Sequence, residues 1–355
     1  MKIQSPLLSK TSLSSVRSSG YTLVELMVAM ALGLFLMMGV FQLNQANQKS
    51  SRLQDSLAQT QKNGRFAIDS ISYAIKTAGY SGFYKDLSTG VDNALKNPTS
   101  SSWDVATPVE GFNNVSNGDN IAGITGFFPG TDVLLLKGMS QDNFRVIANA
   151  STSNMVVASP SAFATGEIVV VSDIDQASVF QISNATSDTV QTTLTLDTAG
   201  NTPGNAALLG SIYDPKAEIG KLKVQMLHIK NGQNGSPALF TTSLVNASGD
   251  IQLQEAELVS DVGDMQISYS VDSNNDSIVD TTQEAHNVTN WNQVIGINIA
   301  ILATSNNDNV LPEKTSYSFD NNLVTFKRDA VATASADRRL KRSFTVYMPL
   351  RNRVL

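Results

Sequence analysis

The chain has 355 residues, with 25 basic and 31 acidic side chains and a formal net charge of −6. This balance disfavours a protein that binds nucleic acid directly, because phosphate binding depends on clustered Lys and Arg side chains. The chain contains no cysteine. A disulfide framework, a thiolate nucleophile and a cysteine-based metal or redox site are therefore excluded.

An apolar run covers residues 21–43, and Glu25 is the only charged side chain within it. Its 23 residues are enough to cross a bilayer as a helix. Lys2, Lys10 and Arg17 precede the run, with no acidic residue among them. The positive-inside rule then keeps the first twenty residues in the cytoplasm and sends the rest of the chain across the membrane.

The small residue Gly20 lies before the apolar run, which distinguishes this N-terminus from an ordinary secretory signal. In such a signal the cleavage site follows the apolar region, and the whole apolar segment is removed. Cleavage after Gly20 would remove only a polar leader, residues 1–20. The mature chain would begin at Tyr21, keep its apolar helix and be more acidic, because the leader carries basic residues only.

Glu25 needs a partner, because a carboxylate within a membrane helix costs about 3 kcal/mol on insertion scales and is normally functional. The amine that cleavage creates at Tyr21 would lie one helical turn away. We expect this amine to pair with Glu25 of its own or of a neighbouring chain.

These residues resemble the class III signal of type IV prepilins and pseudopilins, and the matching run is Gly20-Tyr21-Thr22-Leu23-Val24-Glu25-Leu26. The resemblance implies that a prepilin peptidase cuts after Gly20 and methylates the new N-terminus at Tyr21. It also implies that Glu25 directs the docking of subunits. Tyr21 departs from the Phe or Met that usually follows the cut in this family.

A single long helix is predicted for residues 21–80. No proline occurs between Tyr21 and Gly79, so about 58 residues and about 85 Å of helix are allowed. Gly79 and Gly82 are expected to end the helix. Beyond the membrane, mostly apolar residues recur in steps of four and three and form a seam along one face of the helix. They are Leu53, Leu57, Thr60, Gly64, Ala67, Ile71, Ala74 and Ala78. We expect the head to cover this seam.

The remaining residues, 81–355, are predicted to form a β-rich head, which makes the fold class α+β. Apolar or alternating runs predict strands at 133–136, 167–171, 179–182, 190–196, 221–229, 252–258, 265–271, 293–302 and 344–348. Residues 83–130 read as long loops, and the segments near 200–215 and 230–250 read as turns. A seam between two subdomains is predicted near Pro203, although one sheet with a large insertion fits about as well.

One loop has the spacing of a calcium site. Oxygen-bearing side chains occupy loop positions 1, 3, 5 and 9, at Asp272, Asn274, Asp276 and Asp280, and Ile278 offers a carbonyl at position 7. The pattern is imperfect, because Ser277 replaces the usual glycine and Gln283 stands where a bidentate Glu is usual. The alternative is a polar loop of Asx turns. Ca²⁺ is the only cofactor for which the sequence provides a candidate site.

Further blocks resemble the ordered landmarks of PilW-type minor pilins and cover nearly the whole chain. They are Asn63-Gly64-Arg65-Phe66-Ala67-Ile68, Ala78-Gly79-Tyr80-Ser81-Gly82, Gly130-Thr131-Asp132-Val133-Leu134, Glu257-Leu258-Val259 with Tyr269-Ser270-Val271-Asp272, Trp291-Asn292-Gln293-Val294, and Arg342-Ser343-Phe344 with Leu350-Arg351-Asn352-Arg353.

This resemblance implies a type IV pilin-like structural protein of the bacterial inner membrane. Its head would lie in the periplasm and later in the extracellular fibre. The implied partners are other minor pilins, the major pilin, the prepilin peptidase, the inner-membrane assembly platform and an adhesin-like protein at the tip. The implied role is to prime pilus assembly at or near the tip. The alternatives are a J-type pseudopilin of type II secretion and a tip-located adhesive binding module.

No catalytic set is evident. His228 and His286 are isolated in the sequence, and no paired base or oxyanion motif accompanies the serine-rich segments. The sequence therefore predicts a structural protein and no enzyme.

Overall fold

The computed structural model describes residues 20–84, 90–97, 102–158, 163–200, 202–313 and 338–352. The predicted leader lies outside the described residues, except for Gly20. The chain divides into two compact units, Met1–Arg52 and Leu53–Leu355. The second unit contains the end of the long helix and the whole β-rich head.

Helix α1 runs without interruption from Leu23 to Thr77. It ends where Gly79 adopts a φ of 71°, a conformation that costs glycine little, and Gly79 N–H donates to the Lys137 carbonyl oxygen at 2.8 Å. The structure thus has the single long helix that the sequence predicts, from Leu23 to Thr77 rather than over residues 21–80.

The head covers one side of α1 from Ser56 onwards, and Thr60, Ala67, Ile71 and Ala74 are buried there. The predicted seam is wrong at its start, because Leu53 and Leu57 remain 40% and 37% exposed. No residue before Ser56 in α1 is buried, which accounts for Leu53, whereas Leu57 lies beside the helix face that Ser56 and Thr60 bury.

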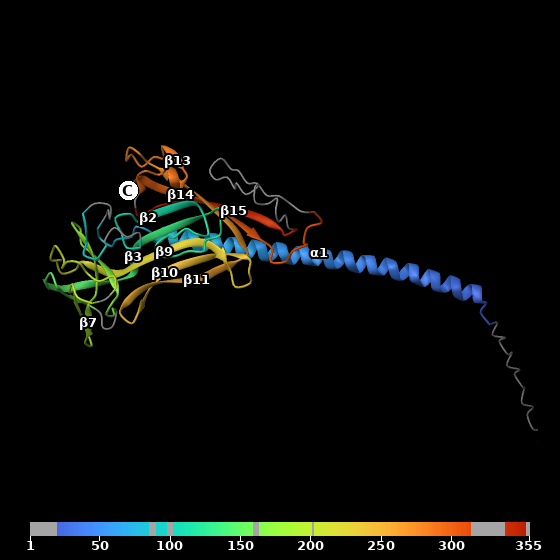
Figure 1. The fold of residues 1–355 in the computed structure, drawn as a ribbon, viewed down its shortest axis with the longest axis horizontal. Helices are drawn as coiled ribbons and strands as arrows, with labels where there is room; N and C mark the ends of the chain where they lie inside the picture. The colour runs from blue at the N-terminus through green and yellow to red at the C-terminus, as the bar shows by residue number, and fades with distance from the viewer. Residues whose placement is uncertain are drawn as a thin grey trace, which may run out of the picture. The chain divides into compact units, whose positions relative to one another are not determined.

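The larger sheet has eleven strands (Figure 1). Along the main path they are ordered β1-β6-β5-β9-β3-β4-β8-β7, while β2 pairs with β3, and β10 joins β9 to β11. The strands are β1 (Val91–Asn93), β2 (Val109–Val115), β3 (Thr131–Ser151), β4 (Asn154–Val157), β5 (Ile168–Ser172), β6 (Ala177–Gln181), β7 (Asn184–Ser187), β8 (Thr192–Thr195), β9 (Glu218–Asn231), β10 (Pro237–Ala247) and β11 (Asp250–Ser260).

The smaller sheet has the order β13-β12-β14-β15. Its strands are β12 (Val262–Val271), β13 (Thr281–Gln283), β14 (Val294–Thr304) and β15 (Lys341–Pro349), with the short 3₁₀ helices η1 (Ala285–Asn287) and η2 (Trp291–Gln293) before β14. Every residue of β14 is buried. This explains why its sequence is a continuous apolar run rather than an alternating one.

One core joins α1 to both sheets. Ile71 and Ile75 of the helix pack in the same buried cluster as Leu227 of β9 and Ile299 of β14. The chain passes from the larger to the smaller sheet at Asp261, between β11 and β12. A division into subdomains near residue 203 stays a prediction.

The structure corrects two of the predicted loop regions. β10 lies within residues 230–250, where turns were predicted, and β1 and β2 lie within residues 83–130, where long loops were predicted. β10 has the polar run Thr241-Thr242-Ser243 at its centre, and it is held by its neighbours: Pro237–Ser243 pair with β9 and Ala238–Ala247 with β11.

Candidate functional site

The start of α1 places Thr22 and Glu25 in a reciprocal pair of hydrogen bonds. Thr22 N–H donates to Glu25 Oε2 at 2.9 Å, and Glu25 N–H donates to Thr22 Oγ1 at 3.2 Å. The Thr22 hydroxyl also donates to Glu25 Oε2, at 3.1 Å. This is a capping box, in which two backbone amides that helix geometry leaves unpaired are both satisfied.

Sequence reasoning missed the role of Thr22, although the signal was present. A threonine followed three residues later by a glutamate at the start of an apolar run is the pattern of a capping box. The expected partner of Glu25 was the amine that cleavage creates at Tyr21. In the structure, with the leader attached, the partner is Thr22, and the pairing with the amine stays a prediction.

The apolar part of α1 is exposed along its whole length. Every residue from Gly20 to Asp55 is exposed. Burial of one large aliphatic or aromatic side chain is worth about 1.5–3 kcal/mol, so a run of this length needs lipid or other protein around it. Among the described residues, α1 is the one helix long and apolar enough to cross a membrane, with a mean hydropathy of 2.3 over its most apolar window.

The predicted calcium loop lies between β12 and β13, and its side chains bond mainly to its own backbone. The two carboxylate oxygens of Asp272 accept N–H groups of Asp276 at 3.2 Å and Ser277 at 2.7 Å. Asn274 and Asp276 each accept an N–H two residues further on. Ser277 has a φ of 66°, so it adopts the conformation for which the motif normally uses glycine.

The donor set of this loop fits calcium only in part. Oxygen donors alternate as a hard cation requires, but Asp280 Oδ2 accepts the N–H and the hydroxyl of Ser273, at 2.8 and 2.5 Å. These bonds lower the pKa of Asp280. Among the described residues, no three His, Cys, Asp or Glu side chains gather as a metal site. Calcium binding through Asp272, Asn274, Asp276, Ile278 and Asp280 stays a prediction.

The two histidines lie in different elements and have different surroundings. His228 is buried in β9 between Phe127 and Phe240, and its Nε2 lies 3.1 Å from Glu255 Oε1. Burial lowers the pKa of His228, while the hydrogen bond with His228 lowers that of Glu255 to about 2. His286 is exposed in η1, where its Nδ1 lies 2.9 Å from Asn113 Nδ2.

The chain has an exposed apolar helix that begins with the Thr22–Glu25 capping box, and a β-rich head follows it. This arrangement is that of type IV pilin-like proteins. Comparison with protein families agrees with this class. The model of the prokaryotic N-terminal methylation motif matches residues 16–41, and that of type IV pilus-assembly protein W matches residues 226–352. These two matches support a PilW-type type IV pilin. No curated protein and no solved structure matches it significantly.

Proposed function

We propose that the chain is made as a prepilin, cut after Gly20, methylated at Tyr21 and held in the inner membrane by α1. Its head then lies in the periplasm. The protein acts as a minor pilin: together with other minor pilins it primes pilus assembly on the inner-membrane platform, and it remains at or near the tip of the fibre.

Accessibility of the cleavage site supports the processing step. Gly20 is exposed, Tyr21 is 89% exposed, and a Cβ added at Gly20 would meet nothing within 4 Å. The fold of this chain therefore does not require glycine at position 20. A requirement for glycine would come from the enzyme that reads the site, and the methylation motif matches at this place.

The assembly step rests on the exposed apolar helix, which is the observation that carries the proposal. In the membrane, lipid surrounds the run that follows Glu25. In a fibre, helices of neighbouring subunits replace the lipid, so the apolar surface stays out of water throughout. A Cβ added at Gly33 or Gly39 would have no atom of the described chain within 4 Å. Both positions are therefore open for close contact with neighbouring helices.

The experiment is the mass of the N-terminal peptide, measured from membranes of cells with and without their prepilin peptidase. We expect an N-methylated peptide that begins at Tyr21 and disappears without the peptidase. Uncut protein in both samples would reject the prepilin assignment. Loss of the gene should then reduce surface pili; normal pili together with lost protein secretion would instead indicate a pseudopilin.

A further inference from the structure

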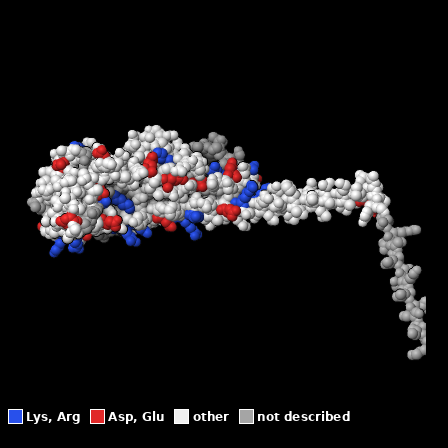
Figure 2. Space-filling view, turned by 90° about the horizontal axis from the view of Figure 1, so that it is seen from below, with Lys and Arg blue, Asp and Glu red and all other residues white. Residues whose placement is uncertain are grey.

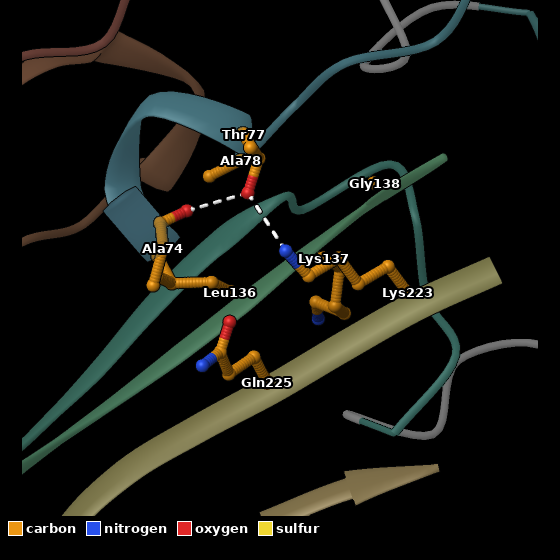
Figure 3. Close-up of a pocket in the computed structure, with 8 residues that line it drawn as sticks. All are labelled: Ala74, Thr77, Ala78, Leu136, Lys137, Gly138, Lys223 and Gln225. Carbon is orange, nitrogen blue, oxygen red and sulfur yellow. Dashed lines mark hydrogen bonds between the residues drawn. The ribbon is translucent and has the colours of Figure 1, made fainter. Parts of the chain in front are cut away.

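A cleft opens where the last turns of α1 meet β9 and β3 (Figure 3). The cleft is open to solvent, and its enclosed part is about the size of one water molecule. The residues that line it are Ala74, Thr77 and Ala78 of the helix end, Leu136, Lys137 and Gly138 of β3, and Lys223 and Gln225 of β9. Of the two lysines, Lys223 lies on the same face of the sheet as Leu136 and its side chain reaches Thr77, whereas Lys137 pairs with Val224 and its side chain lies on the opposite face.

The two lysines differ in their electrostatic partners. Lys137 is fully buried, and its Nζ lies 3.7 Å from Glu110 Oε2. Lys223 Nζ donates to the Thr77 hydroxyl at 3.1 Å and lies 5.1 Å from the centre of the Tyr73 ring. Burial lowers the pKa of Lys223, and within the described chain no carboxylate opposes this effect. Among the described residues, Lys223 is thus a partly desolvated cation without an anionic partner, in a chain that has more acidic than basic residues.

The surface beside the cleft is uncharged. The face of the sheet that carries Gln225 continues across β10 and β11 through Ser243 and Gln254, which are paired in register. The next row adds Thr241 and Ala256. These side chains are partly or fully exposed. Figure 2 shows Lys, Arg, Asp and Glu scattered over one face of the head, with uncharged surface between them.

Two exposed aromatic side chains lie on the last turns of α1 or just before them. Phe66 is 55% and Tyr73 is 61% exposed. They are seven residues apart, which places both on the same face of the helix. Exposed aromatic groups beside an uncharged polar surface are typical of a protein interface, where Tyr and Phe supply contact area and a few charges determine specificity.

We propose that this cleft receives an acidic side chain of a neighbouring pilin subunit, with its carboxylate on Lys223 and its stem against Tyr73. The proposal rests on the proposed function and names a contact for it. The ammonium group supplies the complementary charge. Residues that flank the partner's carboxylate lie over Gln225, Thr241 and Ser243, where no charged group of this chain has to lose its water. A free small anion would use the cleft alone and leave Phe66 and the sheet surface exposed.

The experiment places the photocrosslinking residue p-benzoylphenylalanine at Ser243 of the full chain in pilus-forming cells. We expect an adduct with another pilin subunit, identified by the mass of its peptides. Lys223→Glu should reduce this adduct at least about tenfold, because it replaces the ammonium group by a carboxylate that repels the partner's carboxylate. Lys223→Gln removes the charge with less disturbance and should reduce the adduct in the same direction.

Lys96→Glu is the matched control, because it makes the same charge change at an exposed lysine outside the cleft. It should leave the adduct unchanged. Replacement of the crosslinked partner's acidic residue by Lys should restore the adduct in the Lys223→Glu protein. The proposal is overturned if cleaved, pilus-incorporated wild-type protein gives no adduct at Ser243, or if Lys223→Glu does not lower the adduct. Wild-type protein that is never cleaved would instead reject the proposed function.

Discussion

The carboxylate of Glu25 has a partner before cleavage and, we expect, a second one afterwards. Glu25→Ala removes both, so we expect normal membrane insertion but little or no incorporation into fibres. Glu25→Gln separates the two roles, because glutamine also serves in a capping box but cannot neutralise an amine. Pilus fractions probed for the protein would measure this effect. Full incorporation of Glu25→Gln would show that the capping bonds suffice and that the charge is not needed.

Thr22→Ala removes the capping hydrogen bonds of the Thr22 hydroxyl and keeps the Glu25 carboxylate. Loss of an N-cap residue costs about 1 kcal/mol of helix stability, while the carboxylate remains free for the amine. We therefore expect a smaller loss of incorporation than for Glu25→Ala, measured in the same pilus fractions. An effect as large as that of Glu25→Ala would contradict the separation of roles.

The loop at Asp272 supports a test of calcium binding. Asp272→Ala with Asp276→Ala removes two of the predicted ligands, so it should abolish any rise in melting temperature that calcium gives the full chain in detergent. Without calcium the double variant should also be less stable, because Asp272 caps two backbone N–H groups. The same calcium response in wild type and variant would eliminate this loop as a site.

At the scale of the elements, β15 packs against α1 at a position where only glycine fits. A Cβ at Gly64 would lie 2.1 Å from Phe344 Cε2. Alanine improves helix propensity by about 1 kcal/mol, but overpacking costs about 1–3 kcal/mol. We expect Gly64→Ala to lower the melting temperature of the full chain by a few degrees, and Phe344→Leu to recover part of the loss. The neighbouring Arg65→Ala, on the exposed side, should be neutral or slightly stabilising.

The sequence predicted well those strands whose apolar composition indicates that they are buried. The runs that became β14 and the centre of β3 are continuous and apolar because both of their faces are covered. β10 was missed because Thr241, Thr242 and Ser243 are polar and its strand state depends on pairing with β9 and β11. The cleft at Lys223 depends on the placement of β9 beside Tyr73, 150 residues earlier, and no local pattern reports such a contact.

At the scale of the whole head, one buried carboxylate links the two sheets. Asp132 in β3 accepts the N–H of Asn114 at 2.9 Å, next to it in the larger sheet, and the N–H of Ile267 in β12 at 2.7 Å. Burial is the main cause that raises the pKa of Asp132 to about 7, and the charge of Asp264 adds to it, although the two N–H groups act in the opposite direction. The stability of the contact between the two sheets should therefore depend on pH through the protonation of Asp132.

The sign of this coupling follows from the raised pKa. The folded head holds the Asp132 proton up to about pH 7, whereas the unfolded chain releases it near pH 4. Stability from this group is therefore complete below about pH 4 and is lost as the pH rises through 7. In Asp132→Asn, the melting temperature of the full chain should fall less between pH 4 and pH 8 than in wild type. It should also be lower at pH 4, because the amide group cannot accept both N–H bonds.

Asp119→Asn is the control for the pH dependence, because Asp119 is exposed and hydrogen bonds from Ser116 lower its pKa. It therefore titrates below the window and should leave the change in melting temperature between pH 4 and pH 8 as in wild type. Comparison of each variant with wild type cancels the groups that all share, His228 among them, whose lowered pKa changes stability in the opposite direction. An unchanged pH dependence in Asp132→Asn would mean that Asp132 is already ionised throughout the window and that its two N–H bonds outweigh its burial.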